Sequence, residues 1–371
     1  MTSSEHQTPN SKFTTMKHPY VAIMAGGVGA RFWPASREAR PKQFLDILGV
    51  GKSLLRLTFE RFLHLCPAEN IFIVTNAAYK TLVKEHLPEL TDNQIICEPS
   101  RNNTAPCIAY TAFKLFDIDP QANFVVAPSD HIILKEAAFL EKIKTALDFT
   151  ARNEALCTLG ISPTRPDTGY GYIKFVKGDS EAPHPVLEFK EKPDLETAKS
   201  YLASGDYLWN AGIFVWSAKA ILNAFRENAS DIYTLFAGGA GIYNTAEEQN
   251  FINENYPKSR SISVDFAIME KAKNVFTLPA DIGWSDLGTW ASLHAESEKD
   301  GENNVVQSSH TLLENVSNCL IRAPKNKLLV LRDLEDFIIV DEGDVLMIYP
   351  KSKEQDIKAV TKKLNPEEGY L

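Results

Sequence analysis

Glycine and basic residues cluster directly after the first apolar run of the chain, residues 20–24. In a strand that leads into a glycine turn, backbone N–H groups can approach phosphate oxygens with no side chain in the way. Arg31 and Lys42 would add fixed positive charge beside this turn. The pattern therefore favours a phosphate-binding site over a turn without a ligand. The residues assigned to the turn are Ala25, Gly26, Gly27 and Gly29.

Two other types of phosphate loop fit this sequence less well. A dinucleotide fingerprint that starts at Gly27 requires glycine at position 32, which is Phe32. The segment 51–53 reads Gly-Lys-Ser, as at the end of a Walker A loop, but that loop would begin with glycine where Asp46 stands. Residues 51–53 are therefore interpreted as a turn and cap in front of a helix that begins at Leu54.

Two acidic residues are candidates for holding a divalent cation. Asp130 follows the apolar run 124–127, so its carboxylate is expected at the carboxyl end of a strand. Mg²⁺ commonly binds one or two carboxylates together with substrate phosphates. Asp286 is the second candidate, provided that the fold brings it across the cleft; the alternatives are a turn role for Asp130 and a helix-capping role for Asp286. His131 has no second histidine at ligand spacing and is interpreted as structural.

The elements that must position these residues alternate between strand and helix. Strands are expected at residues 20–24, 71–74, 124–127 and 155–161, with helices at 54–65, 104–116 and 136–147. This alternation is typical of an α/β fold with a mostly parallel sheet that is covered on both faces. Such sheets bind ligands beyond the carboxyl ends of their strands, which is where the polar clusters fall.

After Trp290 the pattern changes to short apolar runs separated by turn residues, from residue 303 onward. Many short strands at near-regular spacing indicate a small all-β domain, such as a coil of strands, and a helix is expected at 354–364. The predicted division is a disordered tail at 1–18, a large α/β domain at 19–295 and a small β domain with its C-terminal helix at 296–371.

Composition limits the class of protein. The chain has 371 residues, of which 44% are hydrophobic and 23% charged, with a formal net charge of −9. These values indicate a globular protein and disfavour nucleic acid or an anionic membrane as the partner. The five cysteines include no C-x-x-C pair, and no run approaches the ~18 apolar residues of a membrane span. A cytoplasmic protein is expected.

The ordered motifs resemble those of the sugar-nucleotide pyrophosphorylases, and most of all the mannose-1-phosphate guanylyltransferases. The resemblance begins with Gly-Gly-x-Gly-x-Arg-x-Trp-Pro-x-Ser-Arg at residues 26–37 and Pro-Lys-Gln-Phe at 41–44. It continues through the blocks at 98–106, 128–131, 168–173, 189–193, 209–214 and 283–288. One glycine loop is weak evidence, whereas seven ordered blocks over residues 20–290, with residues 26–44 counted as one block, are strong evidence.

This resemblance implies a fold, a reaction and further site residues. The fold would be a Rossmann-like nucleotidyltransferase domain followed by a small left-handed β-helix-like domain, which in this family often contributes to homodimer contacts. The reaction would be Mg²⁺-dependent, with mannose 1-phosphate and GTP giving GDP-mannose and pyrophosphate by in-line attack at the α-phosphate. Arg31, Lys42 and Lys192 would be catalytic. The sugar would contact Gly171, Glu191, Lys192 and Asn210, and the chain would be a short form without the isomerase domain of longer relatives.

Glu98 is the candidate for recognising the base. The Watson–Crick edge of guanine offers adjacent donors on its ring nitrogen and exocyclic amine, and one carboxylate can accept from both. A surface acid at a strand end is the alternative. Asn103 and Thr104 could donate to the base carbonyl or only cap the following helix. Asp130 is also assigned to the nucleotide site.

Three other functions remain open at this point. One is a nucleotidyltransferase acting on another hexose 1-phosphate, and another is a catalytically silent nucleotide-sugar sensor. A nicotinamide-dependent oxidoreductase would use the same strand and glycine turn, but Phe32 argues against it. An active enzyme is favoured because the chain retains Arg31, Lys42, Asp130, Lys192 and Asp286 together.

Overall fold

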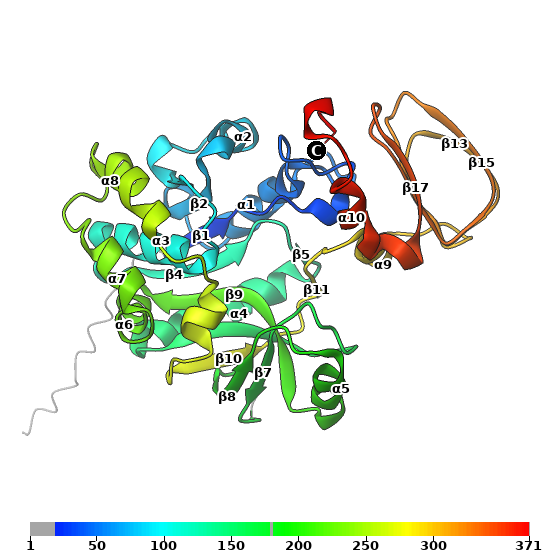
Figure 1. Ribbon diagram of the computed structural model, residues 1–371. Coiled ribbons are helices and arrows are strands. Elements are labelled where there is room, and N and C mark those ends of the chain that lie inside the picture. Colours follow the sequence, from blue (N-terminus) through cyan, green and yellow to red (C-terminus); the bar gives the residue numbers. More distant parts are fainter. Residues whose placement is uncertain (1–18, 179–180, 371) are drawn as a thin grey trace, which may run out of the picture.

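The structure is a computed structural model that describes residues 19–178 and 181–370. The predicted tail at residues 1–18 lies outside the described residues. Figure 1 shows a large α/β part, followed along the chain by a small part built from strands.

A nine-stranded sheet of order β3-β2-β1-β4-β9-β6-β10-β8-β7 forms the centre of the large part. The first four strands in this order, β3, β2, β1 and β4, are parallel to their neighbours, and β6 is parallel to β10. The strand β9 runs antiparallel to β4, β6 and β7, and β8 runs antiparallel to β10 and β7. The α/β prediction is confirmed, but the expectation of a mostly parallel sheet is wrong: the sheet is mixed, because β8 and β9 run antiparallel to their neighbours. The strands are β1 (Tyr20–Met24), β2 (Ile71–Asn76), β3 (Ile95–Glu98), β4 (Asn123–Pro128), β6 (Leu156–Ile161), β7 (Tyr172–Phe175), β8 (His184–Lys190), β9 (Tyr207–Ser217) and β10 (Val275–Pro279).

Helices cover both faces of this sheet because its strands are apolar on both sides. In β1, Val21 and Ile23 pack in one buried cluster with α1 and α4, whereas Ala22 packs in the other with α3 and α6. Successive side chains of a strand point to opposite faces, so a continuous apolar run is suited to a sheet buried on both sides. The helices are α1 (Leu54–Leu63), α2 (Lys80–His86), α3 (Thr104–Ile118), α4 (Glu136–Arg152), α5 (Leu195–Ser204), α6 (Ala218–Asn228), α7 (Ser230–Ala237), α8 (Glu248–Asn255) and α9 (Trp290–Glu296).

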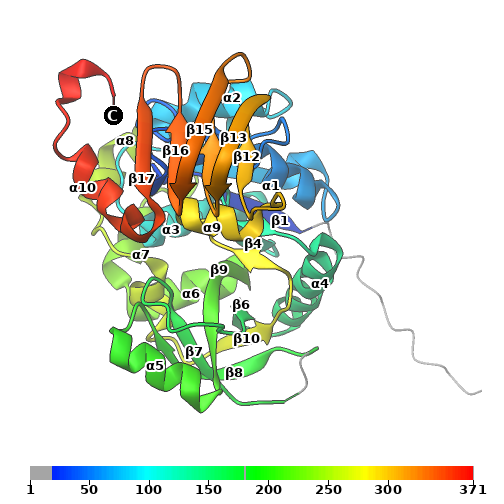
Figure 2. The same cartoon turned by 90° about the vertical axis from the view of Figure 1, so that its right-hand side faces the viewer.

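The small part is a coil of strands that lies beside α9 (Figure 2). The strands β12, β14 and β16 form one sheet of parallel neighbours, and β17 pairs antiparallel with β16 at its edge. The strands β13 and β15 form a second, parallel pair. These parallel pairs of short strands agree with the expected coil, and the left-handed β-helix-like domain stays a prediction. The expected helix at 354–364 is wrong in extent: a 3₁₀ turn at Lys351–Asp356 leads into the short α10 (Ile357–Thr361). The strands are β12 (Val305–Gln307), β13 (His310–Ser317), β14 (Leu320–Arg322), β15 (Leu328–Glu335), β16 (Phe337–Asp341) and β17 (Leu346–Pro350).

A ladder of short polar side chains shapes one corner of this coil. Asn303, Asn318 and Asp336 have φ values of 62°, 51° and 62°, which is the left-handed region that Asn and Asp tolerate better than other non-glycine residues. Asn303 Nδ2 donates to Asn318 Oδ1 at 2.6 Å, and Asn318 in turn donates to Asp336. The polar residues that punctuate the sequence here therefore stack from one turn of the coil to the next.

The coil packs on the α/β part through a shared apolar cluster. The cluster includes Phe32, which follows the glycine turn, Trp290 of α9 and Ile338 of β16, and none of the three is exposed. Phe32 and Trp290 are ring neighbours, with centroids 4.8 Å apart. Two hydrogen bonds continue this contact: Trp290 Nε1 donates to Trp33 O, and Trp33 Nε1 donates to Tyr370 O at 2.8 Å. The segment after the glycine turn therefore rests on the coil and on the last described residues.

The five cysteines are all buried and none forms a disulfide. Within the described residues, every helix is too short or too polar to cross a lipid bilayer.

Candidate active site

The glycine turn lies at the carboxyl end of β1, directly beside the carboxyl end of β4, since Met24 is paired with Pro128. The carbonyl of Ala25 accepts hydrogen bonds from Gln43 Nε2 and Thr75 Oγ1, which fixes the start of the turn. Gly29 has φ +72°, and a Cβ there would lie 2.6 Å from Lys42 Cβ, so this position requires glycine.

The turn leaves its backbone donors unused. Among the described residues, the N–H groups of Gly26, Gly27, Val28 and Gly29 have no acceptor. Gly27 is exposed and the other three are half-buried, so these donors are accessible to a ligand. Consecutive amides that point out of a turn form an anion-binding concavity.

Arg31 and Lys42 differ in their surroundings, although the sequence suggested the same role for both. Arg31 is exposed and has no hydrogen bond or ion pair within the described chain. Lys42 is buried, and its Nζ lies 2.8 Å from Asp130 Oδ2, 2.8 Å from Leu287 O and 3.3 Å from Asp286 O. Lys42 therefore ties the Asp130 segment to the Asp286 segment, and Arg31 is the freely available cation at the turn.

The two predicted metal carboxylates are brought to the same place. The segments that carry them pair as the short strands β5 (Ile132–Ile133) and β11 (Trp284–Ser285), which run antiparallel. Burial alone would raise the pKa of Asp130, but the charge and hydrogen bond of Lys42, with a further contribution from the neighbouring His131, outweigh it and lower the pKa below the ordinary value. Asp286 Oδ1 accepts from the Tyr170 hydroxyl at 2.8 Å. Both carboxylates thus have defined positions, and Asp130 is held in its ionised form.

These two residues fit a magnesium ion. Both supply hard oxygen ligands, and in each carboxylate one oxygen pairs with no side chain of the described chain. Outside the masked residues there is no group of three His, Cys, Asp or Glu side chains arranged to hold a metal, so water and substrate phosphate would have to complete the coordination. His131 instead accepts a hydrogen bond from Trp284 Nε1, in agreement with its structural interpretation.

Glu98 ends β3 close to the glycine turn, and its carboxylate accepts a hydrogen bond from the Tyr256 hydroxyl. Burial raises the pKa of Glu98 to about 7, in spite of the hydrogen bond from Tyr256. Asn103 caps α3 by accepting from Thr104 N, and Thr104 Oγ1 accepts from Val264 N at 2.8 Å. The capping role considered for Asn103 is therefore present, and Thr104 attaches residue 264 to the start of α3.

The predicted sugar residues form one cluster: Gly171 directly precedes β7, Glu191 and Lys192 directly follow β8, and Asn210 lies on β9. Asn210 N donates to Gly171 O at 2.8 Å, and a Cβ on Gly171 would lie 2.5 Å from Glu191 Oε2. Lys192 has φ +47° and an exposed side chain, whose Nζ lies 2.6 Å from Glu191 Oε1. Glycine at 171 thus lets the Glu191 carboxylate approach the backbone, and the Lys192 ammonium lies at the open side.

Three residues of this region were not found from the sequence: Tyr170, Asp265 and Glu270. Asn210 Nδ2 donates to Asp265 Oδ1 at 3.0 Å, and Glu191 N donates to Glu270 Oε1 at 3.1 Å. Burial raises the pKa of Asp265 to about 6, and the nearby Glu191 charge adds to the shift. The signal that could have identified Asp265 is a single acid inside an otherwise apolar run, residues 264–269.

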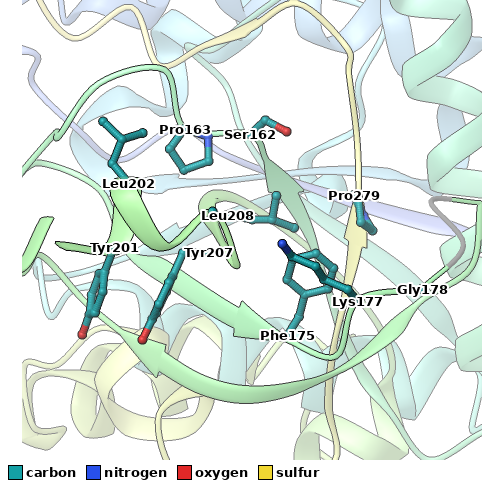
Figure 3. Close-up of a pocket in the computed structure, with 11 residues that line it drawn as sticks. Ser162, Pro163, Phe175, Lys177, Gly178, Tyr201, Leu202, Tyr207, Leu208 and Pro279 are labelled. Carbon is teal, nitrogen blue, oxygen red and sulfur yellow. The ribbon is translucent and has the colours of Figure 1, made fainter. Parts of the chain in front are cut away.

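Two other sequence features have structural roles. Ser53 caps α1 by accepting from Arg56 N, so the interpretation of residues 51–53 as a turn and cap is confirmed. A cavity of about 390 Å³ lies between α5 and the strand edge, lined by residues that include Phe175, Lys177 and Tyr207 (Figure 3). It contains none of the predicted site residues.

Comparison with known proteins places this arrangement in a family. The nucleotidyl transferase family matches residues 20–303. A mannose-1-phosphate guanylyltransferase of Salmonella muenchen is 37% identical over 347 residues, covering 91% of this chain and 72% of the relative, and one of Escherichia coli is 36% identical, with the same coverage of both chains. A solved structure from Thermus thermophilus, described as a mannose-1-phosphate geranyltransferase, superposes with a TM-score of 0.83 at 27% identity, covering 94% of this chain and 99% of that one. The chain belongs to the nucleotidyl transferase family, as an enzyme of its mannose-1-phosphate guanylyltransferase group.

Proposed function

We propose that this enzyme converts mannose 1-phosphate and GTP into GDP-mannose and pyrophosphate. A phosphate oxygen of the sugar phosphate attacks the α-phosphorus of GTP in line, and pyrophosphate leaves from the opposite side. The nucleophile is already an anion at neutral pH, so catalysis consists of positioning and charge stabilisation. The observation that carries the proposal is the row of amides at residues 26–29, which have no acceptor within residues 19–178 and 181–370, beside Arg31 and the Asp130–Lys42 pair.

The phosphate groups bind at the carboxyl ends of β1 and β4. The amides of the glycine turn and the exposed Arg31 bind the triphosphate, because both present donors without a partner in the described chain. Lys42 keeps Asp130 ionised and adds positive charge close to the departing pyrophosphate. Asp130 and Asp286 would hold Mg²⁺, which supplies charge neutralisation at the reacting phosphates when bound.

The base and the sugar lie at opposite ends of this centre. Glu98 accepts hydrogen bonds from guanine, with Asn103 and Thr104 at the neighbouring helix start. In its ionised form a carboxylate is an acceptor only, so adenine, which lacks the paired donors, leaves it unsatisfied. Glu191 and Asn210 bind the hydroxyls of mannose, and Lys192 reaches the phosphate of the sugar from the open side of the cluster.

A homodimer is the proposed assembly. Its support is an apolar face on the outer side of β13 and β15, where Leu312, Leu328 and Val330 are 50–65% exposed. Leu312 and Val330 are register partners in the parallel pair, so they point to the same side. An apolar strand face that is left open is suited to a second copy of the chain.

Pyrophosphate release tests the reaction. The enzyme with Mg²⁺ and mannose 1-phosphate is supplied with GTP, ATP, UTP or dTTP in turn, and release with GTP together with a GDP-mannose product is expected. Release with another nucleotide would retain the chemistry and assign Glu98 to a structural role. The assay is repeated with glucose 1-phosphate in place of mannose 1-phosphate, and release with glucose 1-phosphate alone would reassign the sugar substrate. If no combination of nucleotide and sugar phosphate releases pyrophosphate, a catalytically silent sensor is favoured.

Arg31→Ala tests the phosphate site within the same assay. Because Arg31 is exposed, its removal leaves packing intact, so we expect turnover to fall about 100-fold or more with an unchanged unfolding midpoint. Arg226→Ala is the matched control, since Arg226 is an exposed arginine on α6 whose side chain has one hydrogen-bond partner in the described part of the chain, its neighbour Asn223. Normal turnover in the Arg31 variant would contradict the assignment.

A further inference from the structure

One segment of the chain touches both ends of the proposed active site. Residues 256–270 contact the base side through Tyr256, which donates to Glu98, and through residue 264, whose amide donates to Thr104. The same segment contacts the sugar side through Asp265 and Glu270. It includes a five-residue π-helix, Asp265–Met269, and π-helical turns are frequent at functional sites.

Asp265 contacts Asn210, one of the proposed sugar-binding residues, and the contacts of Asn210 define how its amide is turned. Oδ1 of Asn210 accepts from Gly212 N at 3.1 Å and lies 2.9 Å from Thr158 Oγ1, whose proton is shared with Ile213 O. Nδ2 of Asn210 donates to Asp265 Oδ1 at 3.0 Å. A backbone N–H cannot accept and an ionised carboxylate cannot donate, so the reverse orientation of the amide would lose both bonds.

This orientation decides what Asn210 can offer to a ligand. Oδ1 is already covered by Gly212 N and Thr158 Oγ1, whereas the second proton on Nδ2 has no acceptor among the described residues. An amide free to turn could donate to one sugar hydroxyl and accept from another. Held as it is here, Asn210 can only donate.

We propose that Asp265 is a positioning residue, which turns the Asn210 amide so that it presents an N–H to a hydroxyl of the sugar phosphate. The hydroxyl that accepts from Asn210 keeps its own proton and can donate it to the adjacent Glu191 carboxylate. Asn210 and Glu191 then select a hydroxyl that is acceptor and donor at once. The inference rests on the proposed sugar-binding role of this cluster.

The direction of the hydrogen bond can be reversed without changing the composition of the pair. In the exchange variant Asn210→Asp/Asp265→Asn, the amide at 265 donates to the carboxylate at 210, so the half-buried pair still consists of one amide and one carboxylate. The carboxylate at 210 cannot donate to the sugar. The expected result is a KM for mannose 1-phosphate raised about tenfold or more, which corresponds to about 1.4 kcal/mol, with the KM for GTP within about twofold of wild type. Assays at pH 8 keep Asp265 of the wild-type enzyme ionised, because its raised pKa is about 6.

Two single variants separate positioning from direct contact. Asp265→Asn keeps an acceptor oxygen for Asn210, so it should retain a KM within about threefold of wild type, whereas Asp265→Ala should reproduce the loss. An equal rise of the KM for mannose 1-phosphate in both single variants would mean that the charge of Asp265 contacts the substrate directly, which would overturn the positioning role. An unchanged KM in the exchange variant or in Asp265→Ala would also overturn the proposal. Asp281→Asn, at an exposed acid paired with Lys135, is the matched control.

The readouts also distinguish this inference from the proposed function. If wild-type enzyme does not consume mannose 1-phosphate with GTP, the proposed function fails. If wild type is active and the exchange variant has unchanged kinetics, only the role of Asp265 fails. Where a variant does not fold, its thermal unfolding curve shows this directly, and Asp265→Asn, which changes no side-chain volume, still tests whether an acceptor at 265 suffices.

Discussion

At the residue scale, the acids of the site have different environments and therefore different chemistry. Asp130 is beside a buried ammonium and stays ionised, whereas Glu98 is buried beside a phenol and its pKa is raised to about 7. An acid with a raised pKa destabilises the folded protein once it must ionise. Glu98 therefore makes a measurable contribution to the pH dependence of stability.

The sign of that contribution follows from linkage. Below pH 4.5, the ordinary value for a glutamate, the carboxyl is protonated in both states and has no effect. Between about 4.5 and 7 the unfolded chain releases the proton and the folded chain retains it, so stability falls as pH rises, by about 3 kcal/mol in total. Glu98→Gln cannot ionise and can still accept from Tyr256. We expect its free energy of unfolding in urea to exceed that of wild type at pH 8 and to converge with it at pH 5.

Glu335→Gln is the control for this comparison, because Glu335 is an exposed acid at the end of β15. Its stability should follow wild type at both pH values. An advantage for the Glu98 variant that is the same at pH 5 and pH 8 would show that packing, and not ionisation, is responsible.

Sequence reasoning at this scale identified residue types better than residue partners. The glycine turn, Asp130, Asp286 and the Gly171–Glu191–Asn210 cluster came from motifs whose positions in the chain are informative. Lys42 was assigned to phosphate, but its burial between Asp130 and the backbone at residues 286–287 depends on a contact across 244 or more positions. Asp265 was missed for the same reason, since only its tertiary contact with Asn210 shows its role.

At the element scale, apolar periodicity in the sequence predicted where strands and helices lie. It did not predict whether neighbouring strands run parallel or antiparallel. An apolar run buried on both faces looks the same in a parallel and an antiparallel strand, so nothing in residues 207–217 indicated that β9 runs against β4 and β6. The coil of strands was recognised from the spacing of short runs, but the ladder of left-handed corner residues at positions 303, 318 and 336 was not.

This corner ladder predicts an unequal response to substitution at Asn318. Asn318→Ala places an ordinary side chain at φ 51° and removes the hydrogen bonds to Asn303 and Asp336, so we expect a loss of about 1–3 kcal/mol in the free energy of unfolding. Asn318→Gly removes the same bonds, but glycine adopts a positive φ without strain. Its loss in the free energy of unfolding should therefore be about 1 kcal/mol smaller. Urea denaturation measures both values.

The control is Asn253→Ala on α8, where the side chain of an exposed asparagine bonds, among the residues that the structure describes, only to a neighbouring glutamine. A change within about 0.5 kcal/mol is expected there. If alanine and glycine at 318 were equally damaging, the backbone conformation would not be the reason that asparagine stands at this corner.

At the scale of the whole molecule, the coil has an inner apolar face toward the α/β part and an outer apolar face on β13 and β15. The proposed dimer would cover the outer face. Val330→Lys places a charge on that face without touching the core, because Val330 is 62% exposed. We expect wild type to sediment at twice the mass of the chain and the variant to shift toward the monomer.

Val176→Lys is the matched substitution for this test, since Val176 is also an exposed valine but lies beyond β7. It should leave the sedimentation unchanged. A wild-type protein that sediments as a monomer, or a Val330 variant that stays dimeric, would contradict the proposed assembly.

The hydrogen bond from Trp33 to Tyr370 joins positions 337 residues apart. Chains are synthesised at about 5–20 residues per second, so roughly 20–70 s separate the appearance of these two residues at the ribosome. During that interval the segment after the glycine turn lacks both the coil and its final hydrogen-bond partner. The glycine turn is thus made early, whereas the segment that follows it gains this hydrogen bond only after residue 370 has been made.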